Sequence, residues 1–363
     1  MTKYTIYGSQ ASLFTGKARG YLRWKGVDFV EHAVNDQIMK EIILPKVGWP
    51  VIPVMQTEAG KIVQDTADIM AEIEANEAGP SVRPEGPVQR FVSELLHTYA
   101  DQWLVVPAMH YRWNYNEDWI YGEFGRSSAP DATPEEQYAL GKARGQMFRG
   151  FVPMLGINDE TIPGIEASYE AFLAEFSAHL DVHPYTFGAR PSLADFAFLG
   201  PLYAHLYRDP ASGEIMKRLA PNVANWTERT IAGEGGDAAL VGEDAIPETL
   251  EPILRRAMDE HLPVLQRSVE QFQGWLATAE AGAEVPRAFG QSEFTQGGRT
   301  GQIITASFSL FRLQAALDEY AAMDDAARTR ADALLDRIGG NALKRFALPA
   351  RLERRNYKLH LAQ

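Results

Sequence analysis

The order of strand and helix patterns before residue 80 constrains the fold of this chain more than any other feature of its sequence. Runs rich in strand formers lie at residues 3–7, 27–34, 51–56 and 61–63, and helical patterns lie at residues 15–25, 36–47 and 65–75. Strands joined by helices should be parallel or mixed, whereas the last two, joined by a tight turn at residues 58–60, should be antiparallel. This pattern predicts an α/β domain of the thioredoxin-like type over residues 1–78.

The rest of the chain has mostly helical periodicity. Residues 77–87, with three prolines and two glycines, predict a linker, and residues 233–236 predict a second one. Between them we expect an all-α domain at residues 88–232, and after them an additional helical extension at residues 240–363. In that extension, apolar residues at three-and-four spacing cover residues 247–279, which Pro252 and Pro263 should bend or break. A glycine-rich loop is expected at residues 290–301, followed by helix up to about residue 337.

Composition limits the kinds of partner. Apolar residues make up 45% of the chain and charged residues 23%, as in an ordinary globular protein. The net charge of −13 argues against a general nucleic-acid binder, which needs a basic face. The first twenty residues lack the apolar core of a signal peptide, and no apolar run is long enough to span a membrane. We therefore expect a cytoplasmic protein with small-molecule partners.

The chain contains no cysteine. It can therefore form no disulfide, no thiolate metal site and no cysteine nucleophile. Thiol chemistry in this protein would need a thiol that arrives with a ligand.

The first candidate site is Ser12, which lies just before the helical pattern that starts near Thr15. A serine hydroxyl can donate its hydrogen to an anion, and the helix N-terminus adds free N–H groups and the positive end of the helix dipole. These groups together favour a bound thiolate over a thiol, whose reference pKa is about 8.5. A thiolate is a nucleophile at neutral pH without a separate base. The alternative is that Ser12 and Thr15 only cap the helix.

The second candidate is Ile52–Pro53 at the start of the third strand. Proline is unusual there because it cannot donate to the sheet ladder. A cis Ile52–Pro53 bond would turn the Ile52 N–H and C=O outward, where they could pair with a peptide-like ligand. Cis bonds occur in only about 5% of X–Pro pairs, so the sequence alone does not assign one. The alternative is that Pro50 and Pro53 simply bound a strand.

The third candidate is Asp65–Thr66 at the start of the helix after the fourth strand. The N–H and hydroxyl of Thr66 could hold a carboxylate, and Asp65 could meet an ammonium group. The head group of an α-amino acid offers both charges. The alternative is capping alone.

In order and spacing, these three motifs resemble the N-terminal domain of cytosolic glutathione transferases. That family has S-x-F-S/T-x-K-x-R after the first strand, then a hydrophobic residue with a cis-proline, then E/D-S/T-x-x-I. Here the three motifs are residues 12–19, residues 52–53 and residues 65–69. The resemblance implies that Ser12 faces the sulfur of glutathione, that Ile52 pairs with the cysteinyl backbone, and that Asp65 and Thr66 hold the γ-glutamyl end. It also implies glutathione as co-substrate and a homodimer.

A second resemblance lies at residues 187–196, which contain the pattern G-x-R-P-S-x-A-D of the helical domain of the same family. Ser192 and Asp195 form a capping box in this pattern, and its role in the family is folding rather than catalysis. The resemblance covers about residues 3–230 and leaves residues 244–363 unexplained.

The second substrate should meet the aromatic segment at residues 103–119. The family's corresponding helices line the acceptor pocket, and here they carry His110, Tyr111, Arg112 and Trp113. Aromatic rings with one cation could bind a flat, partly anionic electrophile. The alternative is that these side chains pack between helices or at a dimer contact.

The resemblance implies a glutathione transferase that conjugates the glutathione thiolate to an apolar or aromatic electrophile. Family members that transfer thiols carry a cysteine near the position of Ser12, and its absence here favours conjugation. Alternatives are a non-catalytic transferase-like binding module and a glutathione-dependent peroxidase or reductase.

Two weaker features complete the sequence. His179 and His183 are four residues apart, but no third ligand is evident, so no metal is expected. The last 23 residues hold six basic side chains and one acidic one, so this tail should meet an acidic surface of its own molecule or of a partner subunit.

Overall fold

The computed structural model describes residues 3–362. Contacts divide the chain into two units, and each unit is assembled from segments that are separate in the sequence. The first unit comprises Met1–Val82, Ala108–Val152 and Asp195–Ala238, and the second comprises Arg83–Pro107, Pro153–Ala194 and Ala239–Gln363.

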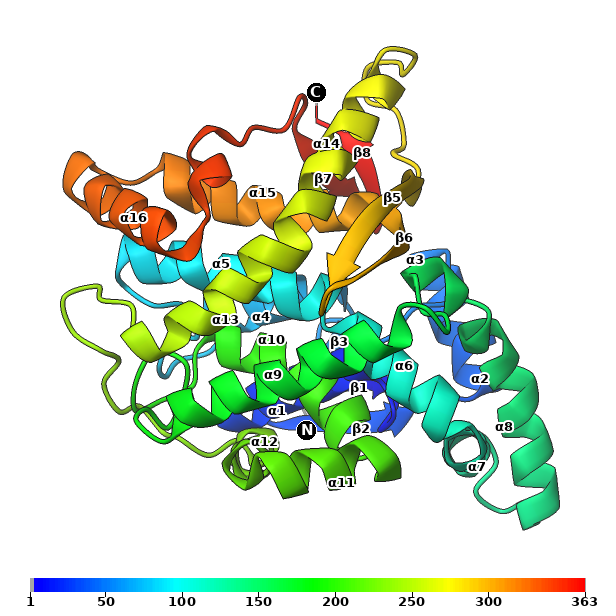
Figure 1. The fold of residues 1–363 in the computed structure, drawn as a ribbon. Coiled ribbons are helices and arrows are strands. Elements are labelled where there is room, and N and C mark those ends of the chain that lie inside the picture. The colour runs from blue at the N-terminus through cyan, green and yellow to red at the C-terminus, as the bar shows by residue number, and fades with distance from the viewer. Residues whose placement is uncertain (1–2, 363) are drawn as a thin grey trace. The chain divides into compact units, whose positions relative to one another are not determined.

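A four-stranded mixed sheet forms the centre of the N-terminal domain in the first unit (Figure 1). Its strands are β1 (Tyr4–Gly8), β2 (Phe29–Ala33), β3 (Val54–Thr57) and β4 (Ile62–Gln64), in the order β2-β1-β3-β4. β1 and β2 are parallel, whereas β3 is antiparallel to both β1 and β4. The predicted thioredoxin-like α/β domain is confirmed.

The helices of this domain begin and end where local signals place them. They are α1 (Leu13–Trp24), α2 (Asp36–Ile38), α3 (Leu44–Val47) and α4 (Thr66–Asn76), with a π-helical turn, Met39–Ile43, between α2 and α3. α1 starts two residues before the predicted position because Ser12, rather than Thr15, occupies the N-cap. After α1 the chain turns at Gly26, whose φ of +70° suits glycine.

Two glycines allow α1 to lie close to its neighbours. A Cβ atom on Gly20 would lie 2.3 Å from Cδ2 of Leu199, and one on Gly16 would lie 3.2 Å from Cδ1 of Tyr203. α1 also contacts α4 and α12 (Pro221–Ala232). α1 is therefore buried on almost every side, and only its N-terminal end can serve a ligand.

The remaining helices of the first unit belong to the predicted helical domain. They are α6 (Val105–Tyr115), α7 (Glu117–Ser128), α8 (Pro134–Arg149), α10 (Leu193–Pro201) and α11 (Pro210–Leu219), with a π-helical segment, Leu202–Tyr207, after α10. α7 and α8 form a close hairpin because Gly125 and Gly141 leave no side chain between them. α10 begins directly after Ser192, where the capping motif predicts a helix start.

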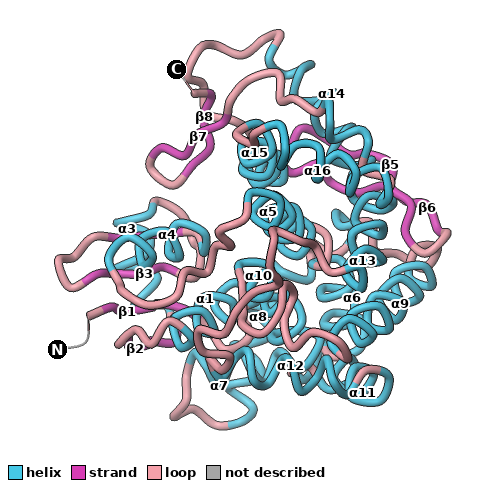
Figure 2. The backbone as a smooth tube through the Cα atoms, turned by 90° about the vertical axis from the view of Figure 1, so that its left-hand side faces the viewer, coloured by secondary structure: helices cyan, strands magenta, loops and turns pink. Residues whose placement is uncertain are grey.

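The second unit is built mainly from helices. They are α5 (Pro87–Gln102), α9 (Ile162–Leu180), α13 (Glu251–Arg256), α14 (Leu262–Leu276), α15 (Ser307–Ala321) and α16 (Asp325–Ile338). Short 3-10 turns lie at Pro153–Leu155, Glu248–Leu250 and Asn341–Arg345, and a π-helical turn, Ala257–His261, joins α13 to α14. Figure 2 shows α5 beside α15 and α16, and α5 contacts both.

Two β-hairpins in the C-terminal extension differ from the sequence-based expectation. One pairs β5 (Ala288–Gln296) with β6 (Arg299–Ala306), and the other pairs β7 (Leu352–Arg355) with β8 (Lys358–Leu361). The prediction of a glycine-rich loop at residues 290–301 is wrong. Gly297 and Gly298, with φ of +53° and +75°, form the tight turn of the first hairpin instead.

Two other expectations for the extension are confirmed. Pro252 and Pro263 lie in the first turns of α13 and α14, and the π-helical turn Ala257–His261 directly before α14 interrupts the α-helical hydrogen bonding of this stretch. The basic tail pairs with acidic side chains of the same unit, through Lys344–Asp336, Arg351–Asp318 and Lys358–Glu284.

No helix in residues 3–362 combines enough length with enough apolar character to cross a membrane.

Candidate functional site

The strand register brings the three sequence motifs to one end of the sheet. Tyr7 near the end of β1 pairs with Val54 at the start of β3, and Val54 also pairs with Gln64 at the end of β4. The loop at residues 9–12 follows β1, Ile52–Pro53 directly precedes β3, and Asp65–Thr66 follows β4. Residues that are more than fifty positions apart in the sequence therefore share one edge of the sheet.

Ser12 is the N-cap of α1, and its hydroxyl oxygen accepts a hydrogen bond from the Thr15 N–H at 3.2 Å. The capping interpretation of Ser12 is therefore confirmed. Capping uses only the oxygen as acceptor, and within residues 3–362 the hydroxyl hydrogen of Ser12 has no acceptor. The first turn of α1 carries no acidic residue that would repel an anion. This helix end can therefore both cap itself and donate to a ligand.

Gly8 allows the loop before Ser12 to fold back on α1. A Cβ atom on Gly8 would lie 2.2 Å from Cγ2 of Thr15, which real atoms do not tolerate. The hydroxyl of Thr15 accepts a hydrogen bond from the N–H of Ser9 at 3.3 Å, so Thr15 holds the start of the same loop.

The Ile52–Pro53 peptide bond is cis. Pro53 is buried and Ile52 is half-buried. Within residues 3–362, neither the N–H nor the C=O of Ile52 has a hydrogen-bond partner. An extended ligand at this edge could therefore use both groups.

Asp65 is the N-cap of α4, where its carboxylate accepts from the N–H of Ala67 at 2.9 Å. Its φ of +81° with ψ of 139° is a conformation that costs a non-glycine residue on the order of 1–3 kcal/mol. Thr66 is buried, yet its N–H and its hydroxyl have no hydrogen-bond partner in the described part of the chain. The start of α4 thus combines a carboxylate on a strained backbone with two donors that the described chain does not use.

The four residues predicted to form the acceptor pocket are all buried. His110, Tyr111, Arg112 and Trp113 have exposed fractions between 0% and 2%. The ring of His110 lies 4.9 Å from that of Tyr111, and its Nδ1 pairs with the amide of Asn114 at 2.8 Å. The ring of Trp113 also lies 6.0 Å from that of Tyr121 in α7. The burial of all four side chains and this contact favour the alternative in which they pack between helices.

Arg112 has a structural partner of its own. Its Nε and Nη2 donate to the two carboxylate oxygens of Asp209 at 2.7 and 2.8 Å, and Nη2 also donates to the carbonyl of Ala204. Burial raises the pKa of Asp209, and the charge of Arg112 acts in the opposite direction. A guanidinium used in this way is not available to bind an anionic substrate.

Arg112 also reaches the site loop. Its Nη1 donates to the carbonyl oxygen of Ala11 at 2.7 Å, one residue before Ser12. Arg208, which the sequence did not single out, donates to the neighbouring carbonyl of Gln10 at 2.8 Å. No sequence pattern marks Arg208, because it lies 198 positions from its loop partner.

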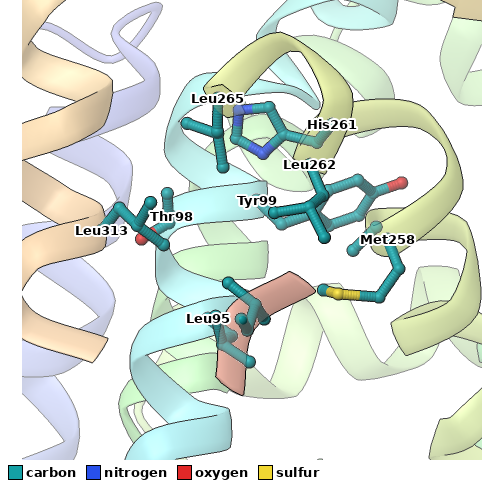
Figure 3. Close-up of a pocket in the computed structure, with 10 residues that line it drawn as sticks. Leu95, Thr98, Tyr99, Met258, His261, Leu262, Leu265 and Leu313 are labelled. Carbon is teal, nitrogen blue, oxygen red and sulfur yellow. The ribbon is translucent and has the colours of Figure 1, made fainter. Parts of the chain in front are cut away.

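The second unit contains a small cavity that none of these motif residues lines (Figure 3). Its volume is about 10 Å³, roughly the room that one water molecule needs. Figure 3 shows the ring of Tyr99 beside Met258 and His261, surrounded by leucines. This cavity is too small for a tripeptide such as glutathione.

The two histidines considered as metal ligands also have other roles. His179 is hydrogen-bonded to Thr249 and to the carbonyl of Tyr185, and burial lowers its pKa to about 4. Its ring lies 5.3 Å from that of His183. No cluster of three potential ligands for a metal ion occurs among residues 3–362.

Comparison with family models gives two matches. Residues 6–81 match the model of the glutathione S-transferase N-terminal domain, and residues 159–229 match the model of the glutathione S-transferase C-terminal domain. The first match contains Ser12, Ile52–Pro53 and Asp65–Thr66, and the second contains the capping motif at Ser192. No curated protein matches the sequence.

Several solved structures are similar to this chain at low sequence identity. A GST-like protein from Pseudomonas syringae is 17% identical, with a TM-score of 0.45, and the match covers 85% of this chain and 98% of that one. Beta-etherase LigF from a Sphingobium strain is 18% identical, with a TM-score of 0.46 and coverages of 63% and 94%. A theta-class glutathione S-transferase from Xanthomonas axonopodis pv. citri, solved with glutathione bound, is 17% identical, with a TM-score of 0.39 and coverages of 66% and 100%.

Proposed function

Because the chain belongs to the glutathione S-transferase superfamily, we propose that it is a glutathione transferase in which Ser12 activates the glutathione thiol. One observation carries the proposal. Ser12 lies at the positive end of α1 with a hydroxyl hydrogen that has no acceptor in residues 3–362. A thiolate at this point would gain a hydrogen bond and a favourable helix dipole, whereas a neutral thiol would gain little from either.

The proposed reaction is a nucleophilic substitution or addition. The thiol of glutathione releases its proton to solvent, and the hydroxyl of Ser12 holds the resulting thiolate. The sulfur forms a bond to an electrophilic carbon. In a substitution, the leaving group departs with the electron pair of the broken bond. In an addition, the conjugated system of the electrophile takes up the electron pair of its double bond and is then protonated by solvent. Each unit by which the thiol pKa falls corresponds to about 1.4 kcal/mol of preference for the thiolate. A shift of two units would make the thiolate the main form at pH 7.

Glutathione itself would bind across the three motifs. The N–H and C=O of Ile52 are suited to pair with the backbone of its cysteinyl residue, because the described chain does not use them. The unused donors of Thr66 would hold the α-carboxylate of the γ-glutamyl residue, and the carboxylate of Asp65 would meet its ammonium group.

For the second substrate we propose an apolar or aromatic electrophile that approaches from the side of α6. His110, Tyr111, Arg112 and Trp113 would then shape this side from within, since they are buried. Arg112 touches the carbonyl of Ala11, so this part of α6 lies beside the loop that carries Ser12. A homodimer and a cytoplasmic location stay predictions from the family resemblance.

A second candidate function is a glutathione-binding module without catalysis. The burial of all four expected pocket residues favours it, because a transferase needs an open site for its electrophile. The two functions share the glutathione site and differ only in turnover.

Calorimetric titration with glutathione, followed by turnover assays with a panel of aryl halides, epoxides and enones, tests the proposal. We expect saturable binding and conjugation with at least one class, and a loss of conjugation but not of binding in Ser12→Ala. Binding without turnover on the whole panel would favour the module. No binding at millimolar glutathione would contradict both functions.

A further inference from the structure

Three successive carbonyl groups before Ser12 each accept a hydrogen bond from a different arginine. Arg19 donates to the carbonyl of Ser9 at 3.4 Å, Arg208 to that of Gln10 at 2.8 Å and Arg112 to that of Ala11 at 2.7 Å. The three arginines come from α1, from the end of the π-helical segment after α10, and from α6. We call these three contacts the arginine clamp.

Each arginine of the clamp is held by its own carboxylate. Arg19 pairs with Glu31 through two bonds of 2.6 and 2.7 Å, and Arg112 pairs with Asp209 in the same forked manner. Arg208 pairs with Glu123 at 2.6 Å. The forked pairs of Arg19 and Arg112 fix the plane of each guanidinium, so their donors that face the loop are fixed as well. Arg208 instead uses one guanidinium nitrogen for Glu123 and the other for the carbonyl of Gln10.

The loop has few hydrogen bonds of its own. Ser12 N–H donates to the carbonyl of Ser9 at 3.1 Å, and Ala11 N–H donates to the hydroxyl of Ser9 at 3.3 Å. Carbonyl contacts determine how the peptide planes at Gln10 and Ala11 are oriented, and the Ala11 plane leads directly into Ser12. The direction of the Ser12 hydroxyl therefore depends on side chains that are distant in the sequence.

We propose that Arg112 and Arg208 are positioning residues, which set the Ser12 hydroxyl for the thiolate by holding the carbonyls of Ala11 and Gln10. This inference rests on the proposed function of Ser12. Neither arginine needs to touch glutathione for this role, because each acts through the loop backbone.

Arg208 is the member that can be tested without unfolding the protein. The side chain of Arg112 is 3% exposed and that of Asp209 is fully buried, so changing Arg112 would leave a buried charge without its partner. The side chain of Arg208 is 20% exposed and lies 5.8 Å from the ring centre of Trp119. Arg208 uses Nη1 for the carbonyl of Gln10 and Nη2 for Glu123. In Arg208→Lys the charge remains, but one ammonium group cannot replace these two separate nitrogens.

A neighbouring arginine provides a matched control. Arg126 pairs with the same carboxylate, Glu123, and is exposed, but it makes no contact with the loop among its described hydrogen bonds. Arg126→Lys therefore perturbs the carboxylate partner equally while leaving the clamp in place.

The experiment compares wild type, Arg208→Lys and Arg126→Lys with two readouts. The first is the pKa of the glutathione thiol in the complex, from thiolate absorbance against pH, together with kcat and the calorimetric Kd. We expect Arg208→Lys to raise the thiol pKa by about 0.5–1 unit and, through the smaller thiolate fraction, to lower kcat at pH 7 by about 1.5- to 3-fold, with Kd within about twofold. Arg126→Lys should match wild type in all three quantities. A wild-type thiol pKa in Arg208→Lys would overturn the proposal.

The second readout needs no ligand, namely amide hydrogen exchange of the peptide covering residues 9–15 in the free protein. We expect about tenfold faster exchange there in Arg208→Lys than in wild type or Arg126→Lys, at unchanged global stability. If wild type failed to bind glutathione, the proposed function would fail, and this exchange would still decide whether the clamp orders the loop. Unchanged exchange in Arg208→Lys would overturn the clamp itself.

Discussion

The hydroxyl oxygen of Ser12 accepts a hydrogen bond from the backbone N–H of Thr15 at 3.2 Å, so Ser12 caps α1. A capping bond of this kind leaves the hydroxyl hydrogen free to donate. One side chain can therefore stabilise the helix and present a donor at its positive end. The structural and the functional interpretations of Ser12, which exclude each other in the sequence, are compatible in the fold.

Thr66 provides a test of the proposed γ-glutamyl site. Thr66→Val removes a hydroxyl that has no partner in residues 3–362 and keeps the buried shape. We expect glutathione affinity to fall about tenfold, equivalent to about 1.4 kcal/mol, with little change in Tm. Calorimetric titration measures the affinity. Thr98→Val is the matched control, because Thr98 is equally buried but bonds to the carbonyl of Glu94 in the second unit. An equal loss of glutathione affinity in Thr66→Val and Thr98→Val would contradict a ligand role for Thr66.

Two mid-helix glycines should respond in opposite ways to alanine. A Cβ atom on Gly20 would lie 2.3 Å from Leu199, so Gly20→Ala should lower the free energy of unfolding by about 1–3 kcal/mol. Apart from its chain neighbours and the backbone of its own helix, nothing in residues 3–362 lies within 4 Å of the Cβ position of Gly274 in α14, so Gly274→Ala should raise it by about 0.5–1 kcal/mol. Urea denaturation measures both. An unchanged free energy of unfolding in Gly20→Ala would show that α1 packs less tightly against Leu199 than the structure indicates.

His261 should make the protein sensitive to mild acid. Burial lowers its pKa from 6.5 to about 3, so the folded state stays unprotonated where the unfolded chain takes up a proton. The contribution of neutral His261 to the free energy of unfolding is fully present above pH 6.5 and is lost as the pH falls from 6.5 towards 3. It amounts to about 1.4 kcal/mol per pH unit, or about 2 kcal/mol by pH 5.

The variant His261→Phe isolates this contribution, because it keeps a ring against Trp103, which His261 stacks on at 5.3 Å. Denaturant unfolding at pH 7 and pH 5 should show a loss that is about 2 kcal/mol smaller in the variant than in wild type. Equal losses in both proteins would mean that His261 is protonated in the folded state or is not buried.

Tyr99 lines the small apolar cavity and carries a buried hydroxyl that has no hydrogen-bond partner in residues 3–362. An unpaired buried hydroxyl costs free energy, and apolar cavities of this size stay dry. We expect Tyr99→Phe to raise the free energy of unfolding by about 1 kcal/mol in thermal or urea denaturation. A decrease of similar size would show instead that a bound water satisfies the hydroxyl.

Local sequence signals predicted the N-terminal domain because its elements are set by neighbouring residues. The cap at Ser12, the left-handed Gly26 and the cap at Asp65 all act within a few positions of the helices that they bound. For the same reason the candidate site residues of this domain, which end up at one edge of the sheet, could be proposed from the sequence. The sequence also predicted that Ser12 and Asp65 cap their helices.

The partner of Arg112 could not be predicted in this way. Asp209 lies 97 positions further along the chain, and only the packing of α6 against the segment after α10 brings the two together. The sequence therefore suggested a free cation for the substrate where the fold buries an ion pair. The hairpin at β5 and β6 was missed for another reason, since its glycines were taken as signs of a loop. The adjacent Gly297 and Gly298 are a typical hairpin turn and could have been recognised as one.

The proposed transferase function depends most on the ability of Ser12 to lower the pKa of the glutathione thiol. The direct test is the thiol pKa in the complex, from thiolate absorbance against pH, for wild type, Ser12→Thr and Ser12→Ala. We expect about 6.5 for wild type and nearly the same for Ser12→Thr, which keeps the hydroxyl. Ser12→Ala should raise the thiol pKa by more than 1 unit towards the free value of about 8.5, because only the helix dipole remains, and should also cost about 1 kcal/mol through loss of the cap. A Ser12→Ala protein that binds glutathione with the wild-type thiol pKa would contradict the account.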